Sequence, residues 1–252
     1  MKTNFLFSVL FILGTFILFT TCKKKETVPV SAGIKVHRIQ TEVSYNSNNQ
    51  VTEIAYFDYD QSNNLTEINS DDGSSVKYSY EASKVIAKVY NSNNILTEKI
   101  TYNLNSQGLA SSVIDSSSSG ISTQTYNYNG SGYVTSSCLT ENTFKDSVQL
   151  VISGGNIINL TDTVYFGTMV VSTGKIIYEY FTDKTNTIGE QNYGMSFVGK
   201  MNQNLVKTEI QTFGVTPTVI NYAYETDSQG RVTKKIILNG GNYSSVSYTY
   251  EN

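Results

Sequence analysis

The sequence has few of the side chains on which metal and nucleophile chemistry depend. It contains no tryptophan, a single histidine (His37) and two cysteines (Cys22 and Cys138) among 252 residues. Zinc sites and Cys–His catalysis both rely on histidine, and His37 alone supplies little of either. We therefore predict no catalytic residues, no metal site and no cofactor. Cys138 is interpreted as a small buried hydrophobic residue.

Proline and charge are also scarce. Pro29 and Pro217 are the two prolines, and charged residues make up only 15% of the chain. Exposed helix faces are normally rich in Glu, Lys and Ala, so this composition disfavours a helical protein. The many Tyr, Ser, Thr, Asn and Gly residues favour strands joined by polar turns. A net charge of −3 offers no basic surface to nucleic acid, so no nucleic-acid partner is expected.

The N-terminus has the layout of a secretory signal peptide. Lys2 precedes an apolar run from Phe5 to Phe19, which is shorter than the roughly 20 apolar residues of a membrane-spanning helix. The run ends in Leu-Phe-Thr-Thr-Cys22 and resembles a bacterial lipobox, with small residues before the cysteine. We predict a lipoprotein signal peptide over residues 1–21, a lipid on Cys22 and a flexible tether over residues 22–33. An ordinary signal peptide without a lipid is the alternative.

A hairpin repeat recurs along the rest of the chain, and its clearest copy is Tyr222–Lys234. The first strand is followed by the tight turn Asp227-Ser-Gln-Gly230, in which Asp bonds its own backbone and Gly accepts a positive φ. A second strand then runs back. Asn replaces Gly at Asn49, Asn64 and Asn94. Further turn sequences lie at Asn46–Asn49, Gln61–Asn64, Asp71–Gly73, Asn91–Asn94, Asn105–Gly108 and Asn129–Gly132.

The density of these turns predicts an all-β fold. Successive strands joined by tight turns are neighbours, which gives an antiparallel meander, and many twisted strands in one sheet curl. We predict a single domain over residues 34–252 that forms one strongly curved sheet or a partly closed barrel. The segment Thr182–Gly199 lacks alternation, and we expect a loop or short helix that plugs one end of the sheet; a functional loop is the alternative. Separate strands are predicted in the less regular middle, over Val148–Ile152, Ile157–Leu160 and Val164–Phe166.

The motif Tyr-x-Tyr-x-x-Asp-x-x-Gly-Arg-Val-Thr at Tyr222–Thr233 resembles the YD repeat of Rhs-type proteins. Together with the lipobox, the chain is similar to a family of Bacteroidota lipoproteins of unknown function, with YD-like hairpins in a porin-like, curled sheet. Tyr178–Asn186 resembles the middle motif of that family. The resemblance implies a fold and an attachment to the outer membrane through Cys22, on either its periplasmic or its surface face. It implies no chemistry, and no toxin-related role is carried over.

Tyrosine pairs spaced Tyr-x-Tyr are the strongest candidates for a site. Each pair places two rings on one face of a strand, where they form a core ladder with hydroxyls at the wet margin, or an exposed row that contacts a ligand. Recurrence in every repeat favours the ladder. The pairs are Tyr78/Tyr80, Tyr126/Tyr128, Tyr178/Tyr180, Tyr222/Tyr224 and Tyr248/Tyr250.

Acidic residues also recur at one repeat position. Glu53, Glu67 and Glu98 each follow a threonine, and we predict that they face outward rather than forming a catalytic pair. Asp146-Ser-Val148 and Asp162-Thr-Val164 resemble the short acceptor for O-glycosylation in Bacteroidota, and chance matches to so short a motif are equally expected.

These features favour a lipid-anchored cell-envelope protein with a binding or structural role and no catalysis. A glycan, a peptide or another envelope protein is the expected partner, besides the membrane itself. The alternative is a glycan-acting envelope hydrolase with carboxylates inside the curved sheet. Convergence of carboxylates in the interior would favour the hydrolase, and an interior filled with tyrosine would favour the binding protein. A barrel that spans the membrane is disfavoured because most strands carry polar residues on both faces.

Overall fold

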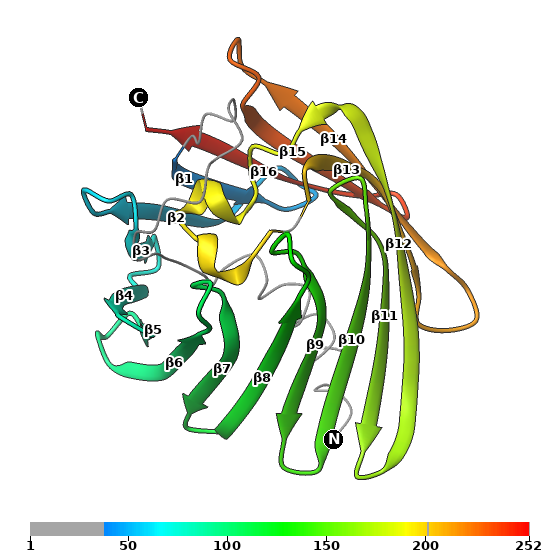
Figure 1. Ribbon diagram of the computed structural model, residues 1–252. Helices are drawn as coiled ribbons and strands as arrows, with labels where there is room; N and C mark the ends of the chain where they lie inside the picture. Colours follow the sequence, from blue (N-terminus) through cyan, green and yellow to red (C-terminus); the bar gives the residue numbers. More distant parts are fainter. Residues whose placement is uncertain (1–37, 201, 252) are drawn as a thin grey trace.

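The computed structural model describes residues 38–200 and 202–251, and in these residues it forms a closed, antiparallel, up-and-down barrel of sixteen strands (Figure 1). The all-β meander is therefore confirmed. The barrel closes completely because β1 (Ile39–Tyr45) pairs with β16 (Asn242–Tyr250) along its length. The predicted signal peptide, the lipid site Cys22 and the tether (residues 1–33) lie outside the described residues.

Each strand is hydrogen-bonded to its neighbours in sequence. The separate strands predicted over 157–160 and 164–166 are wrong, because Asn156–Phe166 is one continuous strand. The bounds of the remaining strands are β2 (Val51–Tyr59), β3 (Leu65–Ser70), β4 (Ser75–Glu81), β5 (Lys84–Tyr90), β6 (Leu96–Leu104), β7 (Ala110–Ser117), β8 (Gly120–Tyr128), β9 (Val134–Glu141), β10 (Phe144–Ser153), β11 (Asn156–Phe166), β12 (Met169–Thr185), β13 (Asn204–Thr212), β14 (Thr218–Thr226) and β15 (Val232–Asn239).

The repeated turns share one hydrogen-bond arrangement. In the β14–β15 turn, Asp227 Oδ1 accepts from the backbone N–H groups of Gln229 and Arg231, and Gly230 has a φ of 76°. The β2–β3 turn repeats it around Asp60, with Asn63 at a φ of 60°. The positive φ was expected at Asn64, one residue too late. Asn tolerates this left-handed conformation, which explains why it replaces Gly in several copies.

A β-bulge follows most of these turns. Tyr59 pairs with Leu65 and Asp58 with Glu67, so Thr66 is the extra residue. Its hydroxyl donates a hydrogen bond to the carbonyl of Asp58 across the ladder at 3.1 Å. In these hairpins the recurring Thr or Ser of the second strand is therefore the bulge residue. The same arrangement occurs at Thr97, Ser111 and Thr135.

The connection between β12 and β13 folds back into the barrel, as predicted, but it begins later than the predicted Thr182, because β12 continues to Thr185. It contains the short 3₁₀ helices η2 (Glu190–Tyr193) and η3 (Ser196–Val198), drawn in yellow in Figure 1. Phe197 is 1% exposed and lies 4.9 Å from the ring of Tyr102, and Tyr193 lies 5.2 Å from Phe57. Lys200 donates its backbone N–H to Gly132 in the β8–β9 turn. We call residues 186–200 the plug, the barrel end it fills the plug end, and the opposite end the far end.

Hairpins at the two ends present opposite faces to the interior. The first residue after the turn is buried at the plug end, as at Leu65 and Val232 (both 0% exposed). At the far end it is exposed, as at Val51 (50%) and Leu96 (48%). The chain continues round the barrel in one direction. A hairpin whose turn lies at the far end therefore has its inward and outward faces exchanged relative to a hairpin whose turn lies at the plug end. A far-end hairpin therefore directs inward the residue that follows its bulge, and Glu98 is such a residue.

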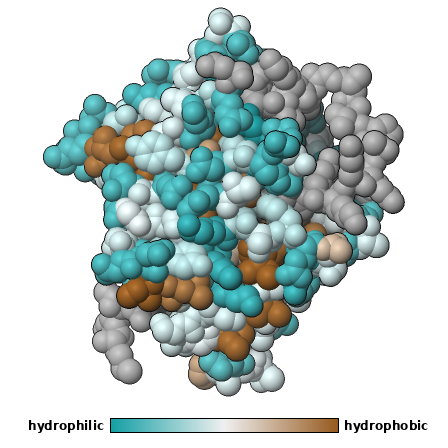
Figure 2. All heavy atoms as spheres, turned by 90° about the vertical axis from the view of Figure 1, so that its left-hand side faces the viewer, coloured by the Kyte–Doolittle hydropathy of each residue, from teal (hydrophilic) through white to brown (hydrophobic). Residues whose placement is uncertain are grey.

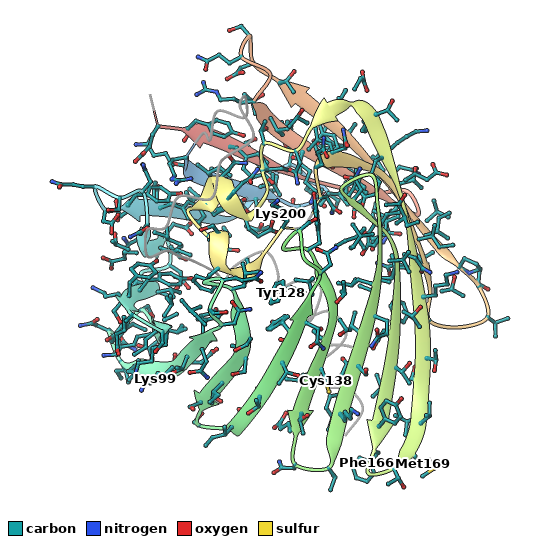
Figure 3. The ribbon with its side chains drawn as sticks, in the orientation of Figure 1. Lys99, Tyr128, Cys138, Phe166, Met169 and Lys200 are labelled. Carbon is teal, nitrogen blue, oxygen red and sulfur yellow. The ribbon has the colours of Figure 1, made fainter. Side chains whose placement is uncertain are left out.

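The outward-facing side chains are mainly polar. Lys77, Lys99 and Lys175 lie exposed within the outward faces of β4, β6 and β12. Figure 2 shows one side of the molecule, where hydrophobic residues form separate patches on a mostly hydrophilic surface. At the far-end tip of the β11–β12 hairpin, Phe166 and Met169 are 61% and 65% exposed (Figure 3). Among the described residues, no helix has the length and hydropathy needed to cross a membrane.

Candidate functional site

The second tyrosine of most pairs joins neighbouring strands at the plug end. Tyr128 donates its hydroxyl hydrogen to the carbonyl of Ala110 at 2.8 Å, and Tyr250 does the same to Val232 at 2.7 Å. In each case the acceptor is the first residue of the preceding strand, and it is buried. These rings therefore fix where each strand begins at the plug end. Further members of this ladder are Tyr59 to Ile39, Tyr80 to Leu65 and Tyr180 to Ile157. Tyr224 packs edge-on against Phe181 instead.

The first tyrosine of each pair also faces the interior, but further from the plug end. Tyr78 and Tyr248 are buried in the core that surrounds the plug. Tyr126, Tyr178 and Tyr222 are half-buried, although their strands direct them inward, so water reaches this part of the barrel. Sixteen strands enclose more space than strand side chains alone can fill. The interior is thus packed at the plug end and wet towards the far end.

One wall of this interior, built by β1 and β13–β16, carries carboxylates with partners. Tyr222 Oη and Gln211 Nε2 donate to the two carboxylate oxygens of Glu209 at 2.9 and 2.5 Å. Glu42 accepts from Tyr193 of the plug at 2.6 Å. Lys235 on β15 lies between these acids, and burial lowers its pKa while Glu42 and Glu209 oppose that shift. Both carboxylates of this wall therefore have hydrogen-bond donors and one nearby cation, although burial still raises the pKa of Glu42.

The opposite wall carries a row of five acids from β6 to β11, which we call the acid row: Glu98, Asp115, Glu141, Asp146 and Asp162. Their inward direction follows from the register. Asp115 lies opposite the core residue Ile100, and Glu141 lies opposite Phe144, two residues before Asp146. Asp162 lies opposite Val148, which is buried. Among the described residues, no ion pair with a lysine or arginine involves any of the five.

Asp146 and Asp162 form the buried end of the acid row. They are 1% and 5% exposed, and they face each other diagonally across the β10–β11 ladder between Val148 and Val164. Within the described residues, both oxygens of Asp146 and Oδ1 of Asp162 have no hydrogen-bond donor. Burial, and then the adjacent Asp162, raises the pKa of Asp146 from 3.8 to about 8. At neutral pH the Asp146 carboxyl therefore keeps its proton.

Glu98 and Asp115 form a second pair nearer the far end. Burial and the neighbouring Asp115 raise the pKa of Glu98 to about 7. Burial is also the main cause of the raised pKa of Asp115, and Glu141 contributes to it. The groups that surround these carboxyls are thus other carboxyls, in contrast to the Lys235 of the opposite wall. Asp115 Oδ1 is buried without a partner among the described residues.

Sequence reasoning placed several of these residues on the wrong face. Glu67 faces outward, where Lys77 pairs with it at 3.1 Å, but Glu53 and Glu98 face inward because their hairpins lie at the far end. Cys138 is half-buried on the outward face of β9, so its interpretation as a core residue is wrong. Its neighbours Ser136 and Thr140, which share that face, were the available signal.

The two Asp-Ser/Thr-Val motifs turn out to be partners. Ser147 and Thr163 lie directly opposite each other on the outward face, whereas both aspartates point inward. The Asp and Val residues of both motifs thus have a structural role, since their side chains line the interior. Glycosylation of Ser147 and Thr163 stays a prediction. An enzyme that acts on the outside of the folded barrel would contact the two hydroxyls but not the aspartates of the motif, which lie on the inward face.

The fold and the site together define a large antiparallel barrel with an internal plug and an acidic interior wall. No protein-family model matches the chain, and no curated protein matches its sequence. Among solved structures, the chain is similar to a porin-like protein from Bacteroides uniformis, with 14% identity, a TM-score of 0.61, and coverage of 84% of this chain and 96% of that one. A weaker similarity, to the TcdB2-TccC3-Cdc42 structure, has 10% identity and a TM-score of 0.36 and spans 13% of that chain.

Proposed function

We propose that the protein is a lipid-anchored barrel of the bacterial outer membrane that holds a ligand in its interior and performs no catalysis. One observation carries the proposal: the plug fills one end of the barrel, while inward-facing tyrosines and the acids Glu98, Asp115 and Glu141 towards the other end are only partly buried. A barrel blocked at one end is a cup rather than a channel. The porin-like description of the Bacteroides structure supports an envelope location.

The outer surface supports attachment through a lipid rather than insertion of the barrel. Lys77, Lys99 and Lys175 are exposed within the outward faces of their strands. A lysine at the midplane of a membrane barrel costs roughly 2–4 kcal/mol, so several of them oppose a lipid-facing surface. A water-exposed barrel tethered through Cys22 agrees with this distribution and with the lipobox.

The anchor is tested with the full chain and its Cys22→Ala variant in a Gram-negative host. We expect the wild type to partition with detergent and to carry an acylated N-terminal cysteine by mass spectrometry. The variant should be released into the aqueous fraction. If the variant stays with membranes after alkaline extraction, the barrel itself is inserted and the proposal is wrong.

A glycan-acting hydrolase is the second candidate, and the convergence of Asp146 and Asp162 is the observation that favours it. The paired carboxyls of glycosidases lie at least about 5 Å apart to accommodate the scissile bond. Asp146 and Asp162 are instead diagonal neighbours on adjacent strands and are 1% and 5% exposed, so a scissile bond does not fit between them. Hydrolysis of envelope or dietary glycans that is lost in Asp146→Asn would establish the hydrolase and contradict the binding role.

A further inference from the structure

We propose that the acid row binds a linear polyamine, with its ammonium groups on the carboxyls and its methylene segments on the apolar side chains between them. This ligand class deepens the proposed binding function and rests on it. The inference starts from the contrast between the two interior walls. Glu42 and Glu209 have donors and a nearby Lys235. Among the described residues, both oxygens of Asp146 and Oδ1 of Asp162 have no hydrogen-bond partner, and no lysine or arginine forms an ion pair with either aspartate.

Unpartnered buried carboxyl oxygens are costly, because they have lost water without gaining a donor. Both oxygens of Asp146 and one each of Asp115 and Asp162 are in this state within the described chain. All three residues lie on the inward faces of their strands. A ligand that brings hydrogen-bond donors would satisfy these oxygens, and a ligand that also brings positive charge would compensate the whole row.

The shape of the acid row favours a chain of cations over a single ion. Its members lie on strands from β6 to β11, and five strand spacings amount to roughly 24 Å. No group of three or more acidic, histidine or cysteine side chains within the described residues is arranged to hold a metal ion. Ammonium groups separated by short methylene segments can meet successive carboxyls, whereas one metal ion meets two at most.

The side chains beside Asp146 suit methylene groups, and Ser122 lies opposite Asp115. Leu139 and Val164 lie directly opposite Asp146 on the two neighbouring strands, and both face inward. Beyond Asp162, the opposite residue is Gly174, and the ring of Phe213 occupies the space where a side chain would be, since an added Cβ would lie 2.0 Å from it. An aromatic ring beside a carboxyl is a favourable place for an ammonium group. A sugar would use the hydroxyl-binding capacity of the acids and leave their charge uncompensated.

Binding of an ammonium group beside Asp146 and Asp162 expels the proton of Asp146 into solvent. Affinity for a polyamine should therefore rise as pH increases from 6 to 8, because the carboxyls lose their protons while the amines keep theirs. A neutral ligand would show the opposite trend or none, since a protonated carboxyl can still donate to a hydroxyl.

The experiment is isothermal titration calorimetry of the full chain, in detergent, with spermidine, maltotriose and calcium chloride as separate probes. We expect saturable spermidine binding, at least tenfold tighter at pH 8 than at pH 6, with proton release in buffers of different ionisation enthalpy. The double variant Asp146→Asn/Asp162→Asn should weaken binding at least tenfold. Glu98→Gln, far along the row, should weaken it severalfold. Glu179→Gln, on the outward face of β12, removes the same charge and should leave binding unchanged.

Absence of saturable spermidine binding at pH 8 overturns the proposal, as does equal weakening by Glu179→Gln, which would indicate non-specific attraction. Binding of maltotriose or calcium without spermidine also overturns the polyamine assignment, while leaving the ligand-holding function intact. The proposed function is tested separately. It is wrong if the Cys22→Ala variant stays inserted in membranes or if the protein hydrolyses glycans.

Discussion

Replacing Asp146 by asparagine should stabilise the barrel, and increasingly so as the pH rises. The folded protein holds a proton on Asp146 that the unfolded chain releases, since burial raises the pKa of Asp146 from 3.8 to about 8. Between these values the folded state binds more protons, so its stability falls with increasing pH. Each pKa unit corresponds to about 1.4 kcal/mol, so at pH 8 the cost amounts to roughly 5 kcal/mol before the surroundings relax and solvent screens the pair.

The asparagine introduced at position 146 would be neutral at every pH, and its amide could donate to the remaining Asp162. We therefore expect Asp146→Asn to equal the wild type near pH 4 and to exceed its free energy of unfolding by about 2–5 kcal/mol at pH 8. Urea unfolding followed by far-UV circular dichroism at pH 4, 6 and 8 measures this, with Glu179→Gln as the surface control. A difference that does not change with pH, or a loss of stability at pH 8, would refute the reasoning.

Three further changes test how the plug and the ladder hold the barrel together. Tyr250→Phe should lose about 1 kcal/mol of unfolding free energy, because the buried carbonyl of Val232 loses its 2.7 Å donor. Phe197→Ala should lose about 3–5 kcal/mol, because it leaves a cavity beside Tyr102, where the plug ring is 1% exposed. Gly199→Ala should lose more than about 1 kcal/mol, since Gly199 has a φ of 90° and its new Cβ would crowd neighbouring atoms. All three are measured by urea unfolding at pH 6.

Matched control variants exist for Tyr250→Phe and Gly199→Ala. Tyr243→Phe removes a hydroxyl that is 3.4 Å from Ser245 and should change stability by less than about 0.5 kcal/mol. Gly214→Ala places a Cβ in open space and should be close to neutral. Equal losses in Tyr243→Phe and Tyr250→Phe would contradict the ladder, and an unchanged Phe197→Ala would contradict a packed plug.

Local features of this fold were readable from the sequence because local chemistry determines them. The Asp227 turn, with its left-handed Gly230, follows from side-chain capping and the absence of a Cβ. Even the plug was predictable, since a long stretch without alternation cannot add a strand to a meander. The shift from Asn64 to Asn63 reflects two adjacent asparagines that are equally able to adopt a positive φ.

The candidate site was much less predictable, because it depends on which end of the barrel each hairpin occupies. The repeats around Glu67 and Glu98 read alike, yet they lie at opposite ends and point in opposite directions. Complete closure was also hidden, since it depends on β1 meeting β16 across the whole chain. The Asp146–Asp162 contact could be found only after β10 and β11 were known to pair in this register.

The exchange of faces between hairpins at the two ends limits how a barrel of this kind can change in size. Gain or loss of one strand would turn every later segment inside out, exposing its tyrosines and burying its lysines. A two-strand step preserves each later orientation, so only duplication or deletion of whole hairpins is tolerated. The diameter of the barrel can thus change only through the gain or loss of two strands at a time. A larger relative would accommodate bulkier ligands with more copies of the same hairpin.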